Sequence, residues 1–522
     1  MNALDYALVA LYLLGMLYLG YRYRAHSDDR DYFLGGNQFG WFATGLSVMA
    51  TQLSAVSFIS VPAFVGARPD GGLQWVSTEL HAPLTMLALM VFIIPPLYRS
   101  GVISVYGYLE QRFSRLTRLL IGGVFLFNRV FASAMIVYTI SLVLDSALGI
   151  GFVPSVLLIG VITVVYSYQG GMRAVIYGDA VQMLLLLLGM IVCGAVALNY
   201  YGGVSEWIAQ IPAERTVALD FDSLGLGDGE EFGFWPLLIG GFFISVAYYG
   251  TDQSEAQRFL SVRDLPTMRR TLLFVGMLRY PVLLAYALLG LLIGPIMLSA
   301  PKFAPALAER SDALVPLFLV NYVPHGLLGL IVVALVAATM SALSSAVNSL
   351  SAVTIEDYFR LGDAEDTRKV RYARFASLFW GVLCLTLALF VGNIDENIVV
   401  AMGKVGSVTF GPILGVFLLS ILIKRVHATA ANIGLAAGIA VNLTLALFFE
   451  EAFFWIWWNV IGTGVTFLVG LLLGRVLPGM VRPLPLTLRP DYAVLRSWEA
   501  WVLYAWFLLV LGVSWGWPLL LG

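Results

Sequence analysis

The chain has 522 residues, of which 60% are hydrophobic and only 12% charged, and its formal net charge at pH 7 is −2. Soluble domains carry about 25% charged residues, so this composition excludes an ordinary soluble enzyme, and the small net charge gives no sign of nucleic-acid binding. Apolar stretches of about 20 residues recur, each able to cross a ~30 Å hydrocarbon core, and they predict an all-α polytopic protein in a lipid bilayer.

The apolar stretches predict about fourteen membrane spans. They are expected at 4–22, 38–67, 72–97, 119–146, 151–168, 175–199, 233–253, 271–295, 325–352, 371–391, 396–423, 430–449, 453–474 and 497–520. The first stretch lacks a small-residue cleavage site and further spans follow it, so we expect no cleavable signal peptide.

Basic residues predict the orientation of these spans. Most of the 30 Lys and Arg residues fall in loops after odd-numbered spans, for example YRYRAHSDDR after the first and RFLSVRDLPTMRR after the seventh. Basic loops stay in the cytoplasm, so both termini are expected outside, in a cell membrane that we take to be a bacterial inner membrane. The acidic segment 200–232 then lies outside, where we expect a solvated loop.

Sequence signatures of enzymes are absent from the chain. Its two cysteines, Cys193 and Cys384, fall inside apolar stretches, and its four histidines show no metal-ligand spacing. The sequence contains no P-loop, HExxH, GxSxG or dinucleotide fingerprint. We therefore do not expect an enzyme, and a membrane-embedded enzyme or a channel is the weaker alternative.

A stripe of polar residues runs along one face of the ninth predicted span, in TMSALSSAVNS at 339–349. The spacing i, i+3, i+4, i+7, i+8 gives the members of the stripe: Ser341, Ser344, Ser345, Asn348 and Ser349. Hydroxyl and carbonyl oxygens with one carboxylate suit a hard cation, and Asp179 is the nearest candidate carboxylate. The alternatives are close helix packing for the stripe, and capping or pairing with Arg173 for Asp179.

Ionisable residues inside the spans are rare, because each costs at least about 2.5–3.5 kcal/mol on insertion scales. The candidates for a functional role among them are Glu79, His81, Arg129, Asp179, Arg279 and Lys404. The excess of cations predicts an electropositive cavity, and an arginine fork suits a carboxylate, so we expect a solute that bears one. The alternative is internal pairing of Arg129 with Glu79 or of Lys404 with Asp179.

Four stretches resemble the sodium/solute symporter family, in the order that the family shows. They are GGMRAVIYGDAVQ at 170–182, AYYGTDQSEAQR at 247–258, MSALSSAVNS at 340–349 followed by TIEDYF, and FGPILGVFLLSILIKRV at 410–426. The resemblance covers nearly the whole chain, with the exception of the last span. It implies a LeuT-type inverted repeat of five plus five helices, each repeat beginning with a helix broken at mid-membrane.

The resemblance also divides the chain into regions, with one extra helix before the repeats and about three after them. The expected regions are an N-terminal span and cytoplasmic loop at 1–37, the first repeat at 38–199, an outer loop at 200–232, the second repeat at 233–423 and C-terminal spans at 424–522.

Sodium is the co-transported ion that the resemblance implies. One ion would be bound by the carbonyls of Ala50, Leu53 and Ala338 and by the hydroxyl of Ser341. Many members have a second hydroxyl where this chain has Ala342, which leaves that site one side-chain ligand short. Members with two sodium sites imply a second ion, bound by Asp179, Ser344 and Ser345.

The solute pocket implied by the resemblance draws on several spans. Its expected residues are Gln52, Ser54, Ser57, Glu79, Arg129, Ser245, Tyr248 as a candidate gate, Arg279 and Lys404. Sugar carriers of the family have a glutamate at the position of Glu79 and a glutamine at that of Lys404. In its sialic acid carriers, an arginine on the helix of Arg129 holds the carboxylate.

The expected function is Na⁺-coupled symport of a small organic solute by alternating access, with two sodium ions. A carboxylate-bearing solute is expected, such as sialic acid, a monocarboxylate or a vitamin-like acid. Two alternatives on the same fold stay open: a proton-coupled carrier in which Asp179 takes the proton, and a sodium-coupled carrier of a neutral sugar. A monomer suffices for this function, and the oligomeric state is not predicted.

Overall fold

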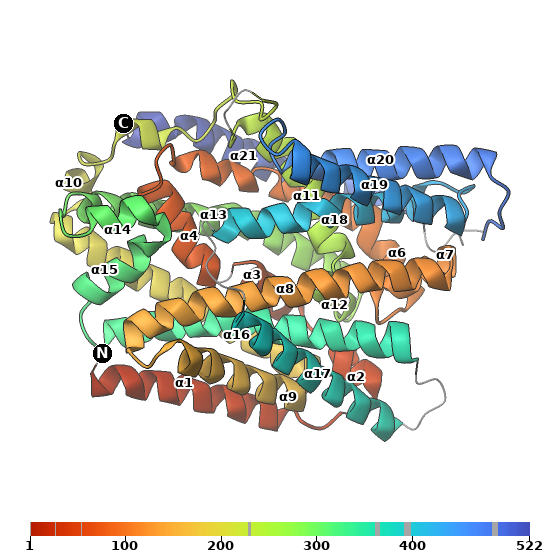
Figure 1. Ribbon diagram of the computed structural model, residues 1–522, viewed down its shortest axis with the longest axis horizontal. Helices are drawn as coiled ribbons and strands as arrows, with labels where there is room; N and C mark the ends of the chain where they lie inside the picture. The colour runs from red at the N-terminus through yellow and green to blue at the C-terminus, as the bar shows by residue number, and fades with distance from the viewer. Residues whose placement is uncertain are drawn as a thin grey trace.

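The computed structural model describes residues 2–26, 28–53, 55–227, 231–360, 366–390, 398–482 and 489–521. Helices account for nearly all the regular structure in these ranges, and long helices run roughly side by side through the molecule (Figure 1). An isolated bridge between Phe39 and Val262 is the β-type pairing found there. The predicted all-α class is confirmed.

The first part of the chain, up to the acidic outer segment, contains ten α-helices within the described residues. Their bounds are α1 (Ala3–Arg22), α2 (Asp29–Leu34), α3 (Trp41–Gln52), α4 (Ala55–Gly66), α5 (Ala82–Ala88), α6 (Ile94–Ser100), α7 (Val105–Arg112), α8 (Arg115–Leu148), α9 (Phe152–Tyr201) and α10 (Val204–Ile208). Short 3₁₀ or π segments join them: η1 (Gly35–Asn37), η2 (Leu73–Glu79), η3 (Leu89–Ile93) and η4 (Ala213–Thr216).

The second part of the chain contains the remaining described helices. The α-helices are α11 (Gly241–Thr251), α12 (Gln253–Leu260), α13 (Leu265–Leu298), α14 (Ala304–Glu309), α15 (Leu314–Tyr322), α16 (Leu327–Val353), α17 (Asp366–Ala388), α18 (Ile398–Leu422), α19 (Ala428–Phe448), α20 (Trp457–Val476) and α21 (Trp498–Leu521). The shorter segments are η5 (Pro236–Gly240), η6 (Ser311–Ala313), η7 (Thr354–Phe359) and η9 (Tyr492–Arg496).

Among the described residues, 11 helices are long and apolar enough to cross a membrane, or 12 if α3 and α4 form one bent span. The two spans predicted at 151–168 and 175–199 both lie in α9, whose arms meet at Gly171 (φ 51°, ψ −150°). Glycine adopts this left-handed φ without the steric penalty of a Cβ. The number of about fourteen spans therefore stays a prediction.

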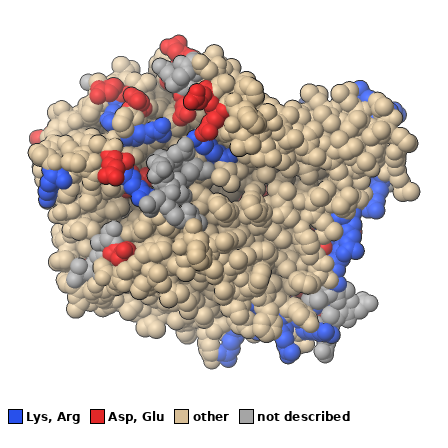
Figure 2. Space-filling view, in the orientation of Figure 1, with Lys and Arg blue, Asp and Glu red and all other residues tan. Residues whose placement is uncertain are grey.

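Charge is distributed unevenly between the two ends of the molecule. Figure 1 marks both chain ends on the left of the view. In the same orientation, Figure 2 shows the acidic side chains gathered at the upper left, together with some basic ones, and mainly basic ones along the right-hand and lower edges. A membrane protein with basic cytoplasmic loops has this distribution, and both termini lie at the end opposite the basic edge.

Two helices are interrupted near the middle of the molecule, as the resemblance implied. Leu53 leaves the helical conformation at the end of α3 (φ −87°, ψ 76°), and α4 follows at an angle of 57° to α3. Asp252 is extended (φ −78°, ψ 126°) between α11 and α12, and its side chain accepts a hydrogen bond from the backbone N–H of Ser254 at 2.7 Å. The repeat boundaries themselves stay a prediction.

Helix α16 lies at the centre of the bundle, against α9, α8 and α3. Its polar stripe is buried along its whole length, so the stripe faces other helices and not lipid. Helices α4 and α13 approach closely where Gly66 meets Gly290 and Gly294: a Cβ on Gly66 would lie 2.3 Å from the Gly290 carbonyl oxygen. Small residues of this kind allow helix backbones to touch in a membrane.

Candidate functional site

A buried carboxylate joins four helices at the centre of the bundle. Asp179 of α9 is fully buried and accepts hydrogen bonds from Ser47 Oγ of α3 and from Ser341 Oγ of α16, both at 2.6 Å. Arg258 of α12 donates to it from Nη2 at 2.9 Å and forms an ion pair with it. The predicted pairings of Asp179 with Arg173 and with Lys404 are wrong, because Arg173 pairs with Asp31 at 2.7 Å and Lys404 pairs with Glu450.

Arg258 is a functional residue that the sequence reasoning missed. It is 1% exposed, and all three of its nitrogens donate hydrogen bonds. Nε donates to Ser47 Oγ at 2.7 Å, Nη1 to the carbonyl of Ser254, and Nη2 to Ser345 Oγ as well as to Asp179. In the sequence, Arg258 is the last residue of the stretch at 247–258. It was missed because the final Gln-Arg resembles the polar end of a membrane span.

The lower part of the α16 stripe packs against α12. Asn348 Oδ1 accepts a hydrogen bond from Gln257 Nε2 at 2.8 Å, and the hydroxyls of Ser349 and Ser254 lie 2.6 Å apart. Ser344 donates instead to the carbonyl of Ser341 on its own helix, at 3.1 Å. Ser341 thus contacts Asp179 directly, and Ser345 contacts Arg258, the ion-pair partner of Asp179. The hydroxyl of Ser344 points toward the α16 backbone.

The predicted ligands of the first sodium ion lie on facing elements. Ala50 and Leu53 belong to the end of α3, and Ala338 belongs to α16, one turn before Ser341; all are buried. The hydroxyl of Thr51 in the same stretch lies 3.3 Å from Ser345 Oγ, so the end of α3 and this part of α16 are in contact. Coordination of an ion by these groups stays a prediction.

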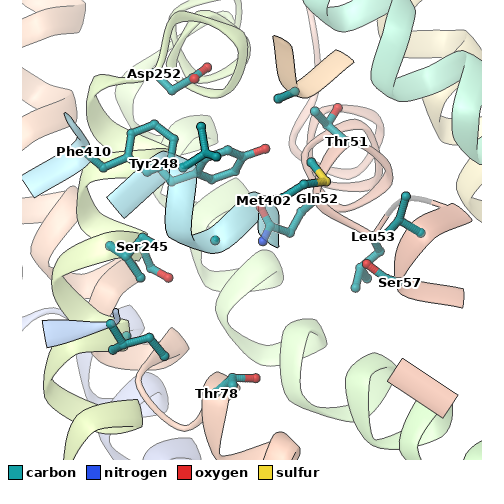
Figure 3. A pocket seen from close by; sticks show the side chains of 18 of the residues that line it. Thr51, Gln52, Leu53, Ser57, Thr78, Ser245, Tyr248, Asp252, Met402 and Phe410 are labelled. Atoms are coloured by element: carbon teal, nitrogen blue, oxygen red, sulfur yellow. The ribbon is translucent and has the colours of Figure 1, made fainter. Parts of the chain in front are cut away.

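A cavity of about 300 Å³ lies beside this polar core. Figure 3 shows Gln52, Leu53 and Ser57 on one side and Ser245 and Tyr248 on the other. Among the solute residues predicted from the sequence, those that line the cavity are Gln52, Ser57, Glu79, Arg129, Ser245, Tyr248 and Arg279. Ser54 lies outside the described residues. Lining residues that the sequence reasoning missed include Thr51, Thr78, Asn128, Asp252 and Phe410.

Lys404 is not among the cavity-lining residues. It belongs to α18 but its ammonium pairs with Glu450, 2.5 Å away, just beyond the end of α19. Its neighbours Gly403 and Val405 line the cavity in its place. The sequence shows only that a lysine lies in an apolar stretch, and the direction in which the flexible side chain leaves the helix depends on the partner it meets.

The buried charges in the cavity wall form a different pairing from the predicted one. Glu79 and Arg279 make a bidentate ion pair, in which Arg279 Nε donates to Glu79 Oε2 at 2.7 Å and Nη2 donates to Oε1. The predicted pair of Arg129 with Glu79 is therefore wrong. Nη1 of Arg279 is buried with no hydrogen-bond partner among the described residues, and His81 lies nearby with its Nε2 3.4 Å from Ser245 Oγ.

Arg129 of α8 is the cationic residue of the cavity that lacks an ion pair within the described part of the chain. It is 9% exposed, and its Nε has no hydrogen-bond partner there. Its nearest electrostatic partners are Asp252, Tyr248 and Glu255. Asp252 is itself held at the start of α12, where its carboxylate caps the helix.

Comparisons with known proteins agree with this architecture. The model of the sodium:solute symporter family matches residues 32–438. The human sodium/iodide cotransporter is 27% identical over 459 residues, which cover 85% of this chain and 70% of that protein. Sodium-coupled monocarboxylate transporter 1 of Xenopus laevis is 27% identical, with 85% and 72% covered.

A bacterial relative is similar over a larger share of its length. The sodium/sialic acid symporter SiaT of Proteus mirabilis (strain HI4320) is 28% identical over 467 residues, which cover 88% of this chain and 92% of that protein. A solved structure of a substrate-bound, outward-open Na⁺-coupled sialic acid symporter matches with a TM-score of 0.82 and 26% identity, covering 92% of this chain and 100% of that one. This match confirms the LeuT-type fold. The chain belongs to the sodium:solute symporter family and is a transporter that uses Na⁺ as its co-transported ion.

Proposed function

We propose that the solute of this sodium-coupled symporter is a small organic acid that carries one carboxylate. The observation that carries the proposal is the state of Arg129: a buried guanidinium in the cavity wall, without an ion pair among the described residues and with a free Nε. A buried charge without a partner is costly, and a carboxylate from the solute would supply the missing partner.

The rest of the cavity supports a single negative charge on the solute. Arg279 is neutralised by Glu79, so this end of the cavity is polar but carries no net charge. The free Nη1 of Arg279 and the hydroxyls of Ser57 and Ser245 suit hydroxyl or amide groups. A cavity of about 300 Å³ lies at the small end of ligand pockets.

The solutes in the names of the similar proteins support an anionic solute for this chain. Iodide is an anion, and monocarboxylates and sialic acid carry a carboxylate at neutral pH. Their cavities therefore handle negative charge together with sodium, in proteins of about the same similarity to this chain. The other hydrogen-bonding groups that line the cavity would then select which acid this chain carries.

We propose that one sodium ion binds between α16 and the end of α3, and a second between α16 and Asp179 of α9. The first ion would be bound by the carbonyls of Ala50, Leu53 and Ala338 and the hydroxyl of Ser341, and the second by Asp179 and the hydroxyls of Ser344 and Ser345. An ion held between α3 and α16 stabilises the conformation in which they touch, and it is coupled to the solute only if both bind that conformation better.

We further propose that the protein lies in a bacterial inner membrane with both termini outside. The supporting observation is that the basic side chains gather at the end of the molecule opposite the two termini (Figures 1 and 2). Sodium and solute would then enter from the end that carries the acidic segment around Asp220 and Asp222.

The test is uptake into proteoliposomes that contain the purified chain, with a panel of radiolabelled monocarboxylates, sialic acid and neutral sugars. An inward sodium gradient should drive accumulation of at least one carboxylate and of no neutral sugar. Replacing sodium by choline should abolish the uptake. Accumulation of neutral sugars alone would contradict the proposed charge, and uptake driven by a proton gradient in choline would contradict sodium coupling.

A further inference from the structure

The pair of Asp179 and Arg258 occupies the place proposed for the second sodium ion. Arg258 donates to Asp179, Ser345 and Ser47, so a guanidinium already uses the oxygens that an ion would need. Both side chains are at most 1% exposed, and no second carboxylate contacts Asp179 within the described residues. One buried carboxylate balances one cation; a sodium ion and Arg258 on Asp179 together would leave a buried positive charge uncompensated.

A second carboxylate is available to Arg258 on its own helix. Glu255 lies three residues before it on α12, a spacing at which side chains of one helix are neighbours. Glu255 is fully buried, and its Oε2 has no hydrogen-bond partner among the described residues. Its Oε1 accepts a hydrogen bond from the hydroxyl of Tyr248 at 3.0 Å.

The position of α12 makes an exchange between the two carboxylates geometrically simple. The helix has only eight residues and follows the extended residue Asp252, so its side chains stand at a break in the bundle. Arg258 already lies within electrostatic range of Glu255. The several staggered torsions of an arginine side chain allow the guanidinium to turn from Asp179 toward a carboxylate on its own helix while the helix stays in place.

We propose that Arg258 is a tethered cation that alternates between Asp179 and Glu255. Without the second sodium ion it neutralises Asp179; when that ion binds Asp179, the guanidinium moves to the free oxygen of Glu255. The proposal rests on the proposed second ion and names the residue that competes with it. The sodium-bound state then contains two cations and two carboxylates, whereas the sodium-free state contains the neutral Asp179–Arg258 pair and Glu255 hydrogen-bonded to Tyr248.

The exchange connects the ion site to the solute cavity. Glu255 holds the hydroxyl of Tyr248, and Tyr248 lines the cavity beside Phe410, with the ring centroids 6.0 Å apart (Figure 3). When Arg258 arrives at the free oxygen of Glu255, it places a positive charge on the carboxylate that holds Tyr248 and so alters the wall next to Arg129. Sodium binding thereby changes the cavity through a group with two discrete positions, which is the physical requirement for coupling.

The same exchange explains how the ion-free carrier can return across its cycle. An unpaired Asp179 in the membrane core would oppose any conformation that excludes water from it. With Arg258 on Asp179, the carboxylate of the empty ion site is paired and hydrogen-bonded, so the return step carries no unpaired Asp179. Arg258 acts here as a positioning residue for the ion site, and it touches neither the first ion's carbonyl ligands nor the solute cavity.

The test measures binding of radiolabelled sodium to the purified full chain, with choline as the replacement cation. Wild-type protein should bind two ions per chain. Glu255→Gln removes the second resting place of Arg258, so the second ion should bind at least about tenfold more weakly, while the first is unchanged. Arg258→Gln removes the competitor, so the second ion should bind about tenfold more tightly. Glu499→Gln, a buried glutamate of α21, is the matched control and should behave as wild type.

The outcomes separate this proposal from the proposed function. If wild-type protein binds no sodium, sodium-coupled symport itself fails. If it binds a single ion that Asp179→Asn leaves unchanged, there is no second ion and the exchange is overturned, whereas sodium coupling stands. The exchange is also overturned if Glu255→Gln binds two sodium ions with the same affinities as wild-type protein. Should Glu255→Gln fail to fold, Arg258→Gln decides: unchanged or weaker second-ion binding there overturns the proposal, and tighter binding supports it.

Discussion

At the residue scale, Arg129 differs from Arg258 and Arg279 because no described carboxylate lies within ion-pair distance of it. We predict that Arg129→Gln weakens binding of the acidic solute about ten- to a hundredfold, the effect of losing a hydrogen bond to a charged group worth about 1.5–3 kcal/mol. Arg129→Lys keeps the charge but loses the planar fork, so its effect should be intermediate.

The measurement for Arg129 is the rise of the thermal unfolding midpoint on addition of solute, in sodium and in choline. Sodium alone should still stabilise Arg129→Gln, since the proposed ion ligands are untouched. Lys404→Gln serves as the control, because Lys404 pairs with Glu450 away from the cavity lining. Solute binding to Arg129→Gln at wild-type strength would remove the guanidinium from the recognition of the carboxylate.

We predict that the stability of the folded protein depends on the Glu79–Arg279 ion pair. Removing one partner of a buried ion pair leaves the other charge unbalanced, which costs about 3–5 kcal/mol. Glu79→Gln should therefore lower the free energy of unfolding by about that amount, and the double variant with Arg279→Gln should recover part of the loss. Thermal or denaturant unfolding in detergent measures both. A single variant as stable as wild type would show that the pair is open to water.

At the element scale, the contact of α4 with α13 depends on the absence of side chains. A Cβ on Gly290 would lie 2.6 Å from the carbonyl oxygen of Pro62, a backbone atom that cannot move aside. Gly290→Ala should therefore separate the helices and destabilise the protein by about 1–3 kcal/mol. Gly512→Ala on α21 is the control, because a Cβ there meets nothing within 4 Å. Equal unfolding midpoints for the two variants would contradict the close contact.

Several long helices could be predicted from sequence alone because a continuous apolar run of about 20 residues is long enough to mark a membrane span. The span predicted at 325–352 is α16 (Leu327–Val353), and that at 497–520 is α21 (Trp498–Leu521). Helix α12 was not predicted, because QSEAQRFL has a polar composition, and its burial depends on the distant helices that pack around it, among them α3 and α16.

The candidate site was predictable as a set of residue types but not as a set of pairs. The resemblance placed Glu79, Arg129 and Arg279 near one cavity, and the structure lines a cavity with all three. Which of them pair depends on the side-chain directions of helices that are 200 residues apart in sequence, as Glu79 and Arg279 are. Sequence patterns report the face of a helix and contain no information about which distant face it meets.

At the scale of the whole molecule, the orientation in the membrane can be tested with added cysteines. The native cysteines, Cys193 and Cys384, are buried and give little background. Glu206→Cys on α10 should react with a membrane-impermeant maleimide in intact cells, because α10 belongs to the proposed outer segment. Arg263→Cys, between α12 and α13, should react only after permeabilisation. The reverse pattern would invert the proposed topology.

The charge that crosses the membrane in one cycle depends on how many ions accompany the solute. A monoanion with two sodium ions moves a net charge of +1, and each 100 mV then contributes about 2.3 kcal/mol to accumulation, which corresponds to about a fiftyfold concentration ratio. With one sodium ion the complex is neutral and the voltage contributes nothing. In proteoliposomes, an inside-negative potassium diffusion potential should therefore raise uptake of the acid strongly. Asp179→Asn should retain sodium-dependent uptake but lose this response, because it keeps only the first ion. Uptake by wild-type protein that is indifferent to voltage would limit the cycle to one sodium ion per anion.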